Sequence, residues 1–174
     1  MARYMSRHSG KHVVQAALIS SIVPFMLKTS NNPDGVDQSV FNRMLASMQE
    51  DRAEFFTGFF KDFYGVGILA QPVSEEFLQW SRSVAMQGSL KATLACANAF
   101  ATTDFRADLA AFQVPTLIIH GTDDKTVPID VSGRAAAQAI ASATLVEYSG
   151  APHGLFATHK DELKGDLLQF VQQY

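Results

Sequence analysis

The sequence has 174 residues, enough for one domain with a sizeable core and too few to favour two. Hydrophobic residues make up 47% of it and charged residues 18%, a composition that excludes a disordered chain. The net charge of -3 gives no electrostatic reason to expect nucleic acid or an anionic membrane as a partner.

The number of cysteines and the length of the apolar stretches indicate the cellular compartment of the protein. The single cysteine, Cys96, excludes an internal disulfide and fits a reducing compartment. Because it stands in an apolar helical pattern, we expect a buried structural thiol rather than a nucleophile. The N-terminal residues lack the apolar segment of a signal peptide, and the longest apolar stretch, residues 13–27, is too short and interrupted to span a bilayer. The sequence therefore predicts a soluble, cytoplasmic protein without a membrane partner.

The first hundred residues read as one strand followed by helices. A helix is predicted over residues 1–9, and an almost continuous apolar run over 13–20 predicts a buried strand. After a loop at 28–35, apolar residues recur at helical spacing in four segments, at about 36–48, 55–63, 73–86 and 90–100. Two interpretations of this helical region stay open: a layer with its own core, or a lid whose surplus aromatic side chains wall an apolar pocket.

The remaining residues alternate between helix and strand. A short helix or turn at 105–113 leads into an apolar strand at 114–120, followed by an Ala-rich helix at 129–141. A second strand follows at 144–148, and a last amphipathic helix runs from Leu163 to Tyr174. This order predicts an α/β fold with a parallel sheet.

An acid and a histidine follow the last two predicted strands. Asp124 and His153 are 29 residues apart, about one helix, one strand and two loops. A right-handed crossover would bring both loops to the carboxyl edge of the sheet. There the carboxylate could orient the imidazole as a general base. The alternatives are that Asp124, or its neighbour Asp123, caps the following helix and that His153 is an ordinary loop residue.

The other histidines give little support to a metal site. The compact spacing of a metal-ligand set is missing from the four candidate residues, which are His120, Asp123, Asp124 and His153. We expect His120 to order the end of its strand through a backbone hydrogen bond. The histidines predicted at the surface are His8, His12 and His159.

About sixty residues at the C-terminal end resemble the α/β-hydrolase family, specifically its cofactor-free haloperoxidase and aryl-esterase branch. The matching motifs are Val-Pro-Thr-Leu-Ile-Ile-His-Gly-Thr-Asp-Asp-Lys-Thr-Val-Pro over 114–128 and Ala-Pro-His-Gly over 151–154. Ser-Leu-Lys-Ala-Thr, Ala-Phe-Ala and Thr-Asp-Phe-Arg, over 89–93, 99–101 and 103–106, match as well. The resemblance extends along the sequence. It implies one partial α/β-hydrolase domain over 1–174, with about three parallel strands, flanking helices and a helical cap-like insertion at 28–105.

The resemblance also implies roles for individual residues. Asp124 becomes the acid and His153 the base of a catalytic triad, and Phe25 and Phe100 help to wall the acyl pocket. Catalysis would need no metal, haem or flavin cofactor.

The sequence departs from the family at the nucleophile. The family carries its serine in a Gly-x-Ser-x-Gly elbow, and no serine of these 174 residues stands in that frame. Ser149 precedes a glycine but lies four residues before His153, on the same loop. In the resemblance, residues 2–4 fall just downstream of the elbow. We therefore expect the C-terminal portion of a serine hydrolase, either as a fragment or as one half of an enzyme assembled with an N-terminal partner chain.

Three functional hypotheses follow. The first is a carboxylic-ester hydrolase portion, with perhydrolase or haloperoxidase activity in the complete enzyme, acting on a small ester. The second is a non-catalytic, self-associating domain that keeps the scaffold and an apolar pocket. The third is slow hydrolysis of activated esters by His153 alone. Because the strand at 13–20 would lack a neighbour, we also predict a homo-oligomer formed through this open edge.

Overall fold

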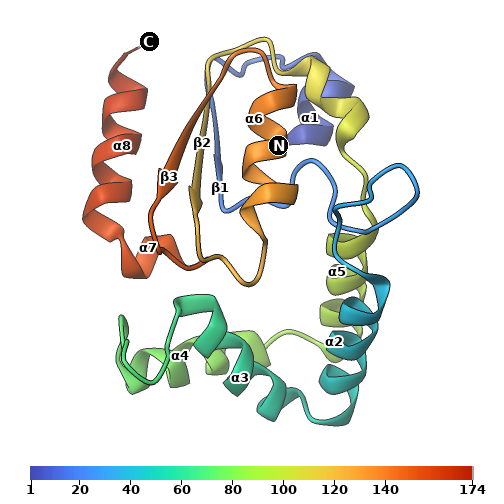
Figure 1. Ribbon diagram of the computed structural model, residues 1–174, viewed down its shortest axis with the longest axis vertical. Coiled ribbons are helices and arrows are strands. Elements are labelled where there is room, and N and C mark those ends of the chain that lie inside the picture. Colours follow the sequence, from blue (N-terminus) through green and yellow to red (C-terminus); the bar gives the residue numbers. More distant parts are fainter. Residues whose placement is uncertain (174) are drawn as a thin grey trace.

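The computed structural model describes residues 1–173 and contains a three-stranded parallel sheet in the order β1-β2-β3 (Figure 1). The strands are β1 (Ala16–Ile19), β2 (Thr116–Gly121) and β3 (Ala143–Tyr148), close to the three predicted segments. In the register, Ala16 lies opposite Thr116, which lies opposite Ala143 on its other side. The α/β class with three parallel strands is confirmed.

Helices account for most of the remaining chain. The N-terminal helix is α1 (Ala2–His8), and the segment between β1 and β2 contains α2 (Gln38–Glu50), α3 (Arg52–Tyr64), α4 (Glu75–Met86), α5 (Leu90–Thr102) and the 3-10 helix η1 (Arg106–Ala111). The C-terminal part contains η2 (Ile129–Val131), α6 (Gly133–Ala139), α7 (Leu155–Thr158) and α8 (Lys160–Gln172). Tyr174, predicted to lie on the last helix, falls outside the described residues.

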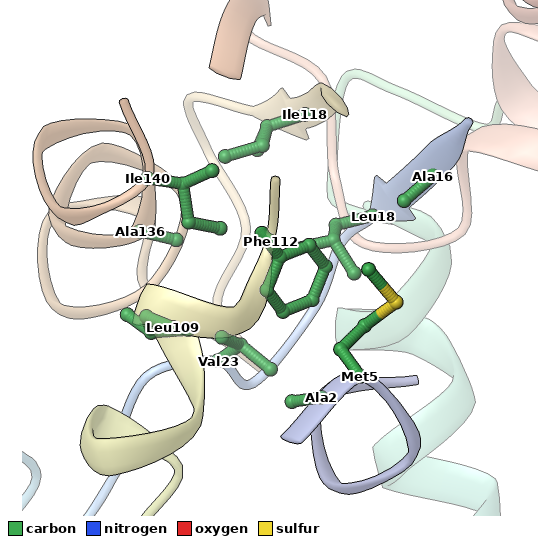
Figure 2. Close-up of a cluster of buried hydrophobic side chains, with 10 residues drawn as sticks. All are labelled: Ala2, Met5, Ala16, Leu18, Val23, Leu109, Phe112, Ile118, Ala136 and Ile140. Carbon is green, nitrogen blue, oxygen red and sulfur yellow. The ribbon is translucent and has the colours of Figure 1, made fainter. Parts of the chain in front are cut away.

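Both faces of the sheet carry helices. On one face, α1, η1 and α6 pack against Leu18 and Ile118, with Phe112 filling the space between them (Figure 2). On the other face, α8 covers Leu117 and Ile119 of β2 (Figure 1). All four of these strand residues are buried, which is why the sequence reads as continuous apolar runs rather than as alternation.

The segment from α2 to α5 lies beyond the carboxyl ends of the strands (Figure 1). Side-chain caps decide where its helices begin: Asp37, Asp51, Ser74 and Ser89 each accept a hydrogen bond from a backbone N–H of the first turn. A cluster that includes Phe41 joins this segment to Val127 in the loop after β2. The helical region therefore sits over the edge of the sheet that carries the loops.

The expectation of a buried Cys96 is wrong, because this thiol is exposed. Alanine surrounds it on α5, and an Ala-rich helix does not reveal from sequence which side faces the core. Helix α5 packs mainly against α2, and Ala101 is its fully buried member. Cys96 instead lines a cavity beside α2 and α3, together with Ala97 and Phe100 of the same helix.

Strand β1 forms one edge of the sheet. Within residues 1–173, β2 is the one strand that pairs with it. Near this edge, Ile19 is 39% exposed and Val14 is 78% exposed. Among residues 1–173, no helix has the length and hydropathy needed to cross a membrane.

Candidate active site

The ends of β2 and β3 are joined by a close backbone approach. Thr122 N donates to Tyr148 O at 2.9 Å, and Asp123 N donates to Ala151 O at 3.0 Å. A Cβ at Gly121 would lie 2.2 Å from the Ala151 carbonyl oxygen, so only glycine fits where the two loops meet. This contact brings the segment after β2 against the segment after β3, as the crossover argument predicted.

Asp124 and His153 meet across this junction. His153 Nδ1 lies 2.7 Å from Asp124 Oδ2, and the carboxylate is buried. The sequence pointed to these two residues by their positions after neighbouring strands, and the structure places them in direct hydrogen-bond contact. A carboxylate in this position holds the imidazole in the tautomer with the proton on Nδ1 and leaves Nε2 to accept one.

The surroundings of Asp124 favour its ionised form. Its Oδ1 accepts hydrogen bonds from Thr126 N at 2.9 Å and from Val127 N at 2.8 Å. Burial opposes ionisation, but the hydrogen bonds from His120 and His153, the charge of His153 and the Val127 N–H outweigh it. Together they lower the pKa of Asp124 from 3.8 to about 2. The acid is therefore charged at neutral pH.

The His153 ring is partly open to solvent, with 16% of its side chain exposed. One of its sides packs against Phe63 of α3, with ring centres 4.6 Å apart. Its backbone carbonyl accepts a hydrogen bond from Ser20 Oγ at 3.0 Å, and Gly154 N donates to Phe63 O at 2.8 Å. These bonds tie the histidine loop to the residue after β1 and to α3, while Asp124 and Phe63 contact the ring itself.

Sequence reasoning missed Ser20 and Phe63. Ser20 directly follows β1, so the argument that selected Asp124 and His153 would also have placed Ser20 at the carboxyl edge of the sheet. It has a positive φ of 43°, an uncommon conformation outside glycine. No comparable signal distinguishes Phe63 from the other phenylalanines of α3.

None of the serines within residues 1–173 makes a hydrogen bond to the His153 ring. Ser20 approaches this residue through its carbonyl instead. The Nε2 atom of His153 has no hydrogen-bond partner in the described part of the chain, and Asp124 occupies Nδ1. The geometry thus presents an acid and a base with the proton-accepting nitrogen unoccupied.

A cavity of about 430 Å³ lies between the helical region and the loop that carries Asp124. Lys125, Thr126 and Pro128 form its border on the loop side. The apolar wall from α2, α3 and α5 includes Phe41, Met44, Phe55, Phe59 and Phe100. This cavity is the apolar pocket that the surplus of aromatic residues suggested.

The two phenylalanines assigned to an acyl pocket lie in different surroundings. Phe100 lines the cavity, with its ring centre 6.1 Å from that of Phe41. Phe25 does not line it: its ring is buried, and the Arg106 guanidinium carbon lies 5.0 Å from the ring centre. A substrate contact by Phe25 stays a prediction.

His120 makes the predicted backbone hydrogen bond, with Nε2 2.9 Å from Val127 O. The same nitrogen also lies 3.1 Å from Asp124 Oδ2, a contact that sequence reasoning missed. The (i, i+4) spacing was visible, but a turn rather than a helix separates the two residues. No group of three or more potential metal ligands was found within residues 1–173.

Comparison with known proteins identifies the fold family. The sequence profile of the alpha/beta hydrolase fold matches residues 1–160. The chain belongs to this family. The resemblance recognised from the motifs over 114–128 and 151–154 is confirmed.

Several individual proteins of this family are similar to the chain. The chain is 38% identical over 173 residues to a non-heme chloroperoxidase of Streptomyces lividans. It is 36% identical over 174 residues to a bifunctional esterase/perhydrolase, DCH, of Acinetobacter calcoaceticus. Each match includes 99% of this chain and 63% of the relative. The structure of a bromoperoxidase from Bacillus anthracis superposes with a TM-score of 0.94 at 36% identity, covering 98% of this chain and 62% of that one. The chain therefore spans less than two thirds of the length of these relatives.

Proposed function

We propose that Asp124 and His153 are the acid and the base of a carboxylic-ester hydrolase. The observation that carries this proposal is the 2.7 Å contact from Asp124 Oδ2 to His153 Nδ1, combined with an Nε2 atom that has no partner in the described chain and a partly exposed ring. A histidine held in this way takes up a proton at Nε2 and is stabilised as an imidazolium by the ionised carboxylate.

The nucleophile in this proposal is a serine supplied by a segment outside the 174 residues, in a separate chain or a longer form of this one. Its oxygen attacks the acyl carbon while His153 Nε2 takes the hydroxyl proton. His153 then passes that proton to the departing alkoxide, leaving an acyl-enzyme and an alcohol. Water, deprotonated by His153, attacks the acyl carbon; the bond to the serine oxygen breaks, His153 returns the proton to that oxygen, and the carboxylic acid is released. Attack by hydrogen peroxide in place of water would give a peracid, in keeping with the perhydrolase named among the relatives.

The apolar cavity supports a small ester with an apolar acyl or aryl group as the substrate. Phenylalanine and methionine side chains form most of its apolar wall. Lys125 and Thr126, the two residues that follow Asp124 in the chain, add polar groups to the lining. Phe100 contributes to the wall from α5. The proposed reaction requires no metal, haem or flavin.

A second candidate function is a non-catalytic, self-associating domain. Strand β1 favours it, because its outer edge has no partner strand within residues 1–173 and Ile19 and Val14 beside it are exposed. Unpaired backbone groups on such an edge can pair with another strand. That strand would come from a second copy of the chain or from the partner that supplies the serine.

Two assays on the purified 174-residue chain test whether it acts without an added nucleophile. We expect neither turnover of a p-nitrophenyl ester nor labelling by a fluorophosphonate, since the nucleophile lies elsewhere. Slow turnover that disappears in His153→Ala, but persists in the control His12→Ala at an exposed histidine, would instead indicate direct action by His153. Labelled serine in this chain would refute the proposal that the nucleophile comes from outside it.

A further inference from the structure

His120 is a fully buried histidine whose protonated nitrogen can be assigned from geometry. Its side chain stands at the carboxyl end of β2 and has no solvent-exposed surface. Nε2 lies 2.9 Å from the carbonyl oxygen of Val127. A carbonyl oxygen only accepts hydrogen bonds, so Nε2 carries the proton and donates it. The same N–H is within reach of Asp124 Oδ2, at 3.1 Å.

The surroundings of the other ring nitrogen, Nδ1, also favour a proton on Nε2. His120 Nδ1 is buried and has no hydrogen-bond partner within residues 1–173. Gly133, the first residue of α6, packs so closely that a Cβ there would lie 2.9 Å from Nδ1 and 3.1 Å from the ring carbon Cγ. A proton on Nδ1 would be a buried donor without an acceptor, which costs free energy. The neutral ring with its proton on Nε2 is the form that fits this space.

His120 Nε2 contacts the part of the Asp124 carboxylate that backbone groups leave free. Oδ1 is held by Thr126 N and Val127 N, at 2.9 and 2.8 Å. Oδ2 faces His153, and within residues 1–173 it receives no backbone N–H and is contacted by the imidazoles of His120 and His153. Val127 closes the arrangement, because its N–H binds Asp124 and its carbonyl binds His120. Hydrogen bonds within the segment from His120 to Val127 therefore surround the Asp124 carboxylate.

We propose that His120 is a positioning residue whose Nε2–H is shared between Val127 O and Asp124 Oδ2 and so holds that oxygen against His153 Nδ1. It does not touch the reacting atoms and acts through the carboxylate. The relevance of this to catalysis rests on the proposed function, whereas the hydrogen-bond arrangement itself can be tested without any turnover.

Proton NMR of the 174-residue chain labelled with ¹⁵N-histidine tests the proposal. In the unmodified chain we expect a low-field proton on His153 Nδ1, and ¹⁵N shifts that place the His120 proton on Nε2. His120→Leu removes the donor and should abolish the low-field resonance. His120→Gln places an amide near the former Nε2 and should retain it. Asp124→Asn, which removes the acceptor, is the control for complete loss.

Three results separate positioning from a merely structural role. If the low-field resonance persists unchanged in His120→Leu, the proposal is overturned. If His120→Leu fails to fold, His120→Gln and the unmodified chain remain as tests: loss of the low-field resonance in folded His120→Gln, or a proton on His120 Nδ1 in place of Nε2, refutes the proposal. Loss in His120→Gln as well as in His120→Leu, with both folded, would mean that shape rather than the donated proton matters. None of these readouts depends on a serine, so failure of the proposed hydrolase would leave them interpretable.

Discussion

Replacing the buried acid gives the most quantitative prediction, because the pKa of Asp124 links its contacts to stability. The pKa lies at about 2 in the folded chain and at 3.8 without the fold's influence. Since one unit of pKa corresponds to about 1.4 kcal/mol, ionised Asp124 contributes about 2 kcal/mol to the free energy of unfolding. The folded pKa is the lower one, so this contribution is complete above about pH 4 and is lost as the pH falls toward 2.

Asp124→Asn removes that dependence while keeping the shape of the side chain. We expect the variant to be less stable than the parent at pH 5, because its amide group faces the N–H donors of His120 and His153. The difference between the two free energies of unfolding should shrink by about 2 kcal/mol between pH 5 and pH 2. Other acids titrate over the same range in both proteins, so the difference isolates Asp124.

Urea unfolding followed by circular dichroism, at several pH values and protein concentrations, measures this difference. A gap between parent and Asp124→Asn that stays constant from pH 5 to pH 2 would contradict the reasoning. It would mean that the hydrogen bonds from the two histidines do not hold the carboxylate in its charged form.

Three further predictions concern other parts of the chain. Gly133→Ala should lower the free energy of unfolding by about 1–3 kcal/mol, since its Cβ would press on the His120 ring; urea unfolding checks this, and an unchanged midpoint would contradict the close packing. Cys96 should react with Ellman's reagent in the native protein without denaturant, and protection until unfolding would show that the thiol is buried after all. Ile19→Lys should shift the protein toward smaller species in analytical ultracentrifugation if β1 is the contact edge, whereas Val171→Lys on α8 should not; a strictly monomeric parent would remove the basis for this expectation.

The sequence determined the sheet more fully than the helical region. Continuous apolar runs ending in polar turns located β2 and β3, and the chain order then placed Asp124 and His153 at one edge. Parallel strands permit this inference because their carboxyl ends meet. The positions of Asp124 and His153 therefore followed from topology before any contact was known.

Contacts that depend on side-chain direction could not be predicted in the same way. The contact between His120 and Asp124 Oδ2 requires a turn that brings residue 124 back over the end of β2, and the spacing of apolar residues does not predict that turn. Cys96 was misjudged because alanine-rich neighbours pack equally well facing inward or outward. The position of Phe100 depends on how the helices after β1 cross, and that of Phe25 on the path of the loop between β1 and α2; apolar spacing predicts neither.

The central claim is that this chain carries the acid and the base for a serine that it does not itself contain. The most direct test joins the chain to a hydrolase segment that bears a Gly-x-Ser-x-Gly elbow. Fluorophosphonate labelling and p-nitrophenyl ester turnover are then measured with and without His153→Ala. We predict that the supplied serine is labelled and that both signals fall steeply in His153→Ala. Labelling that is equally fast in His153→Ala would contradict the assignment of His153 as the base.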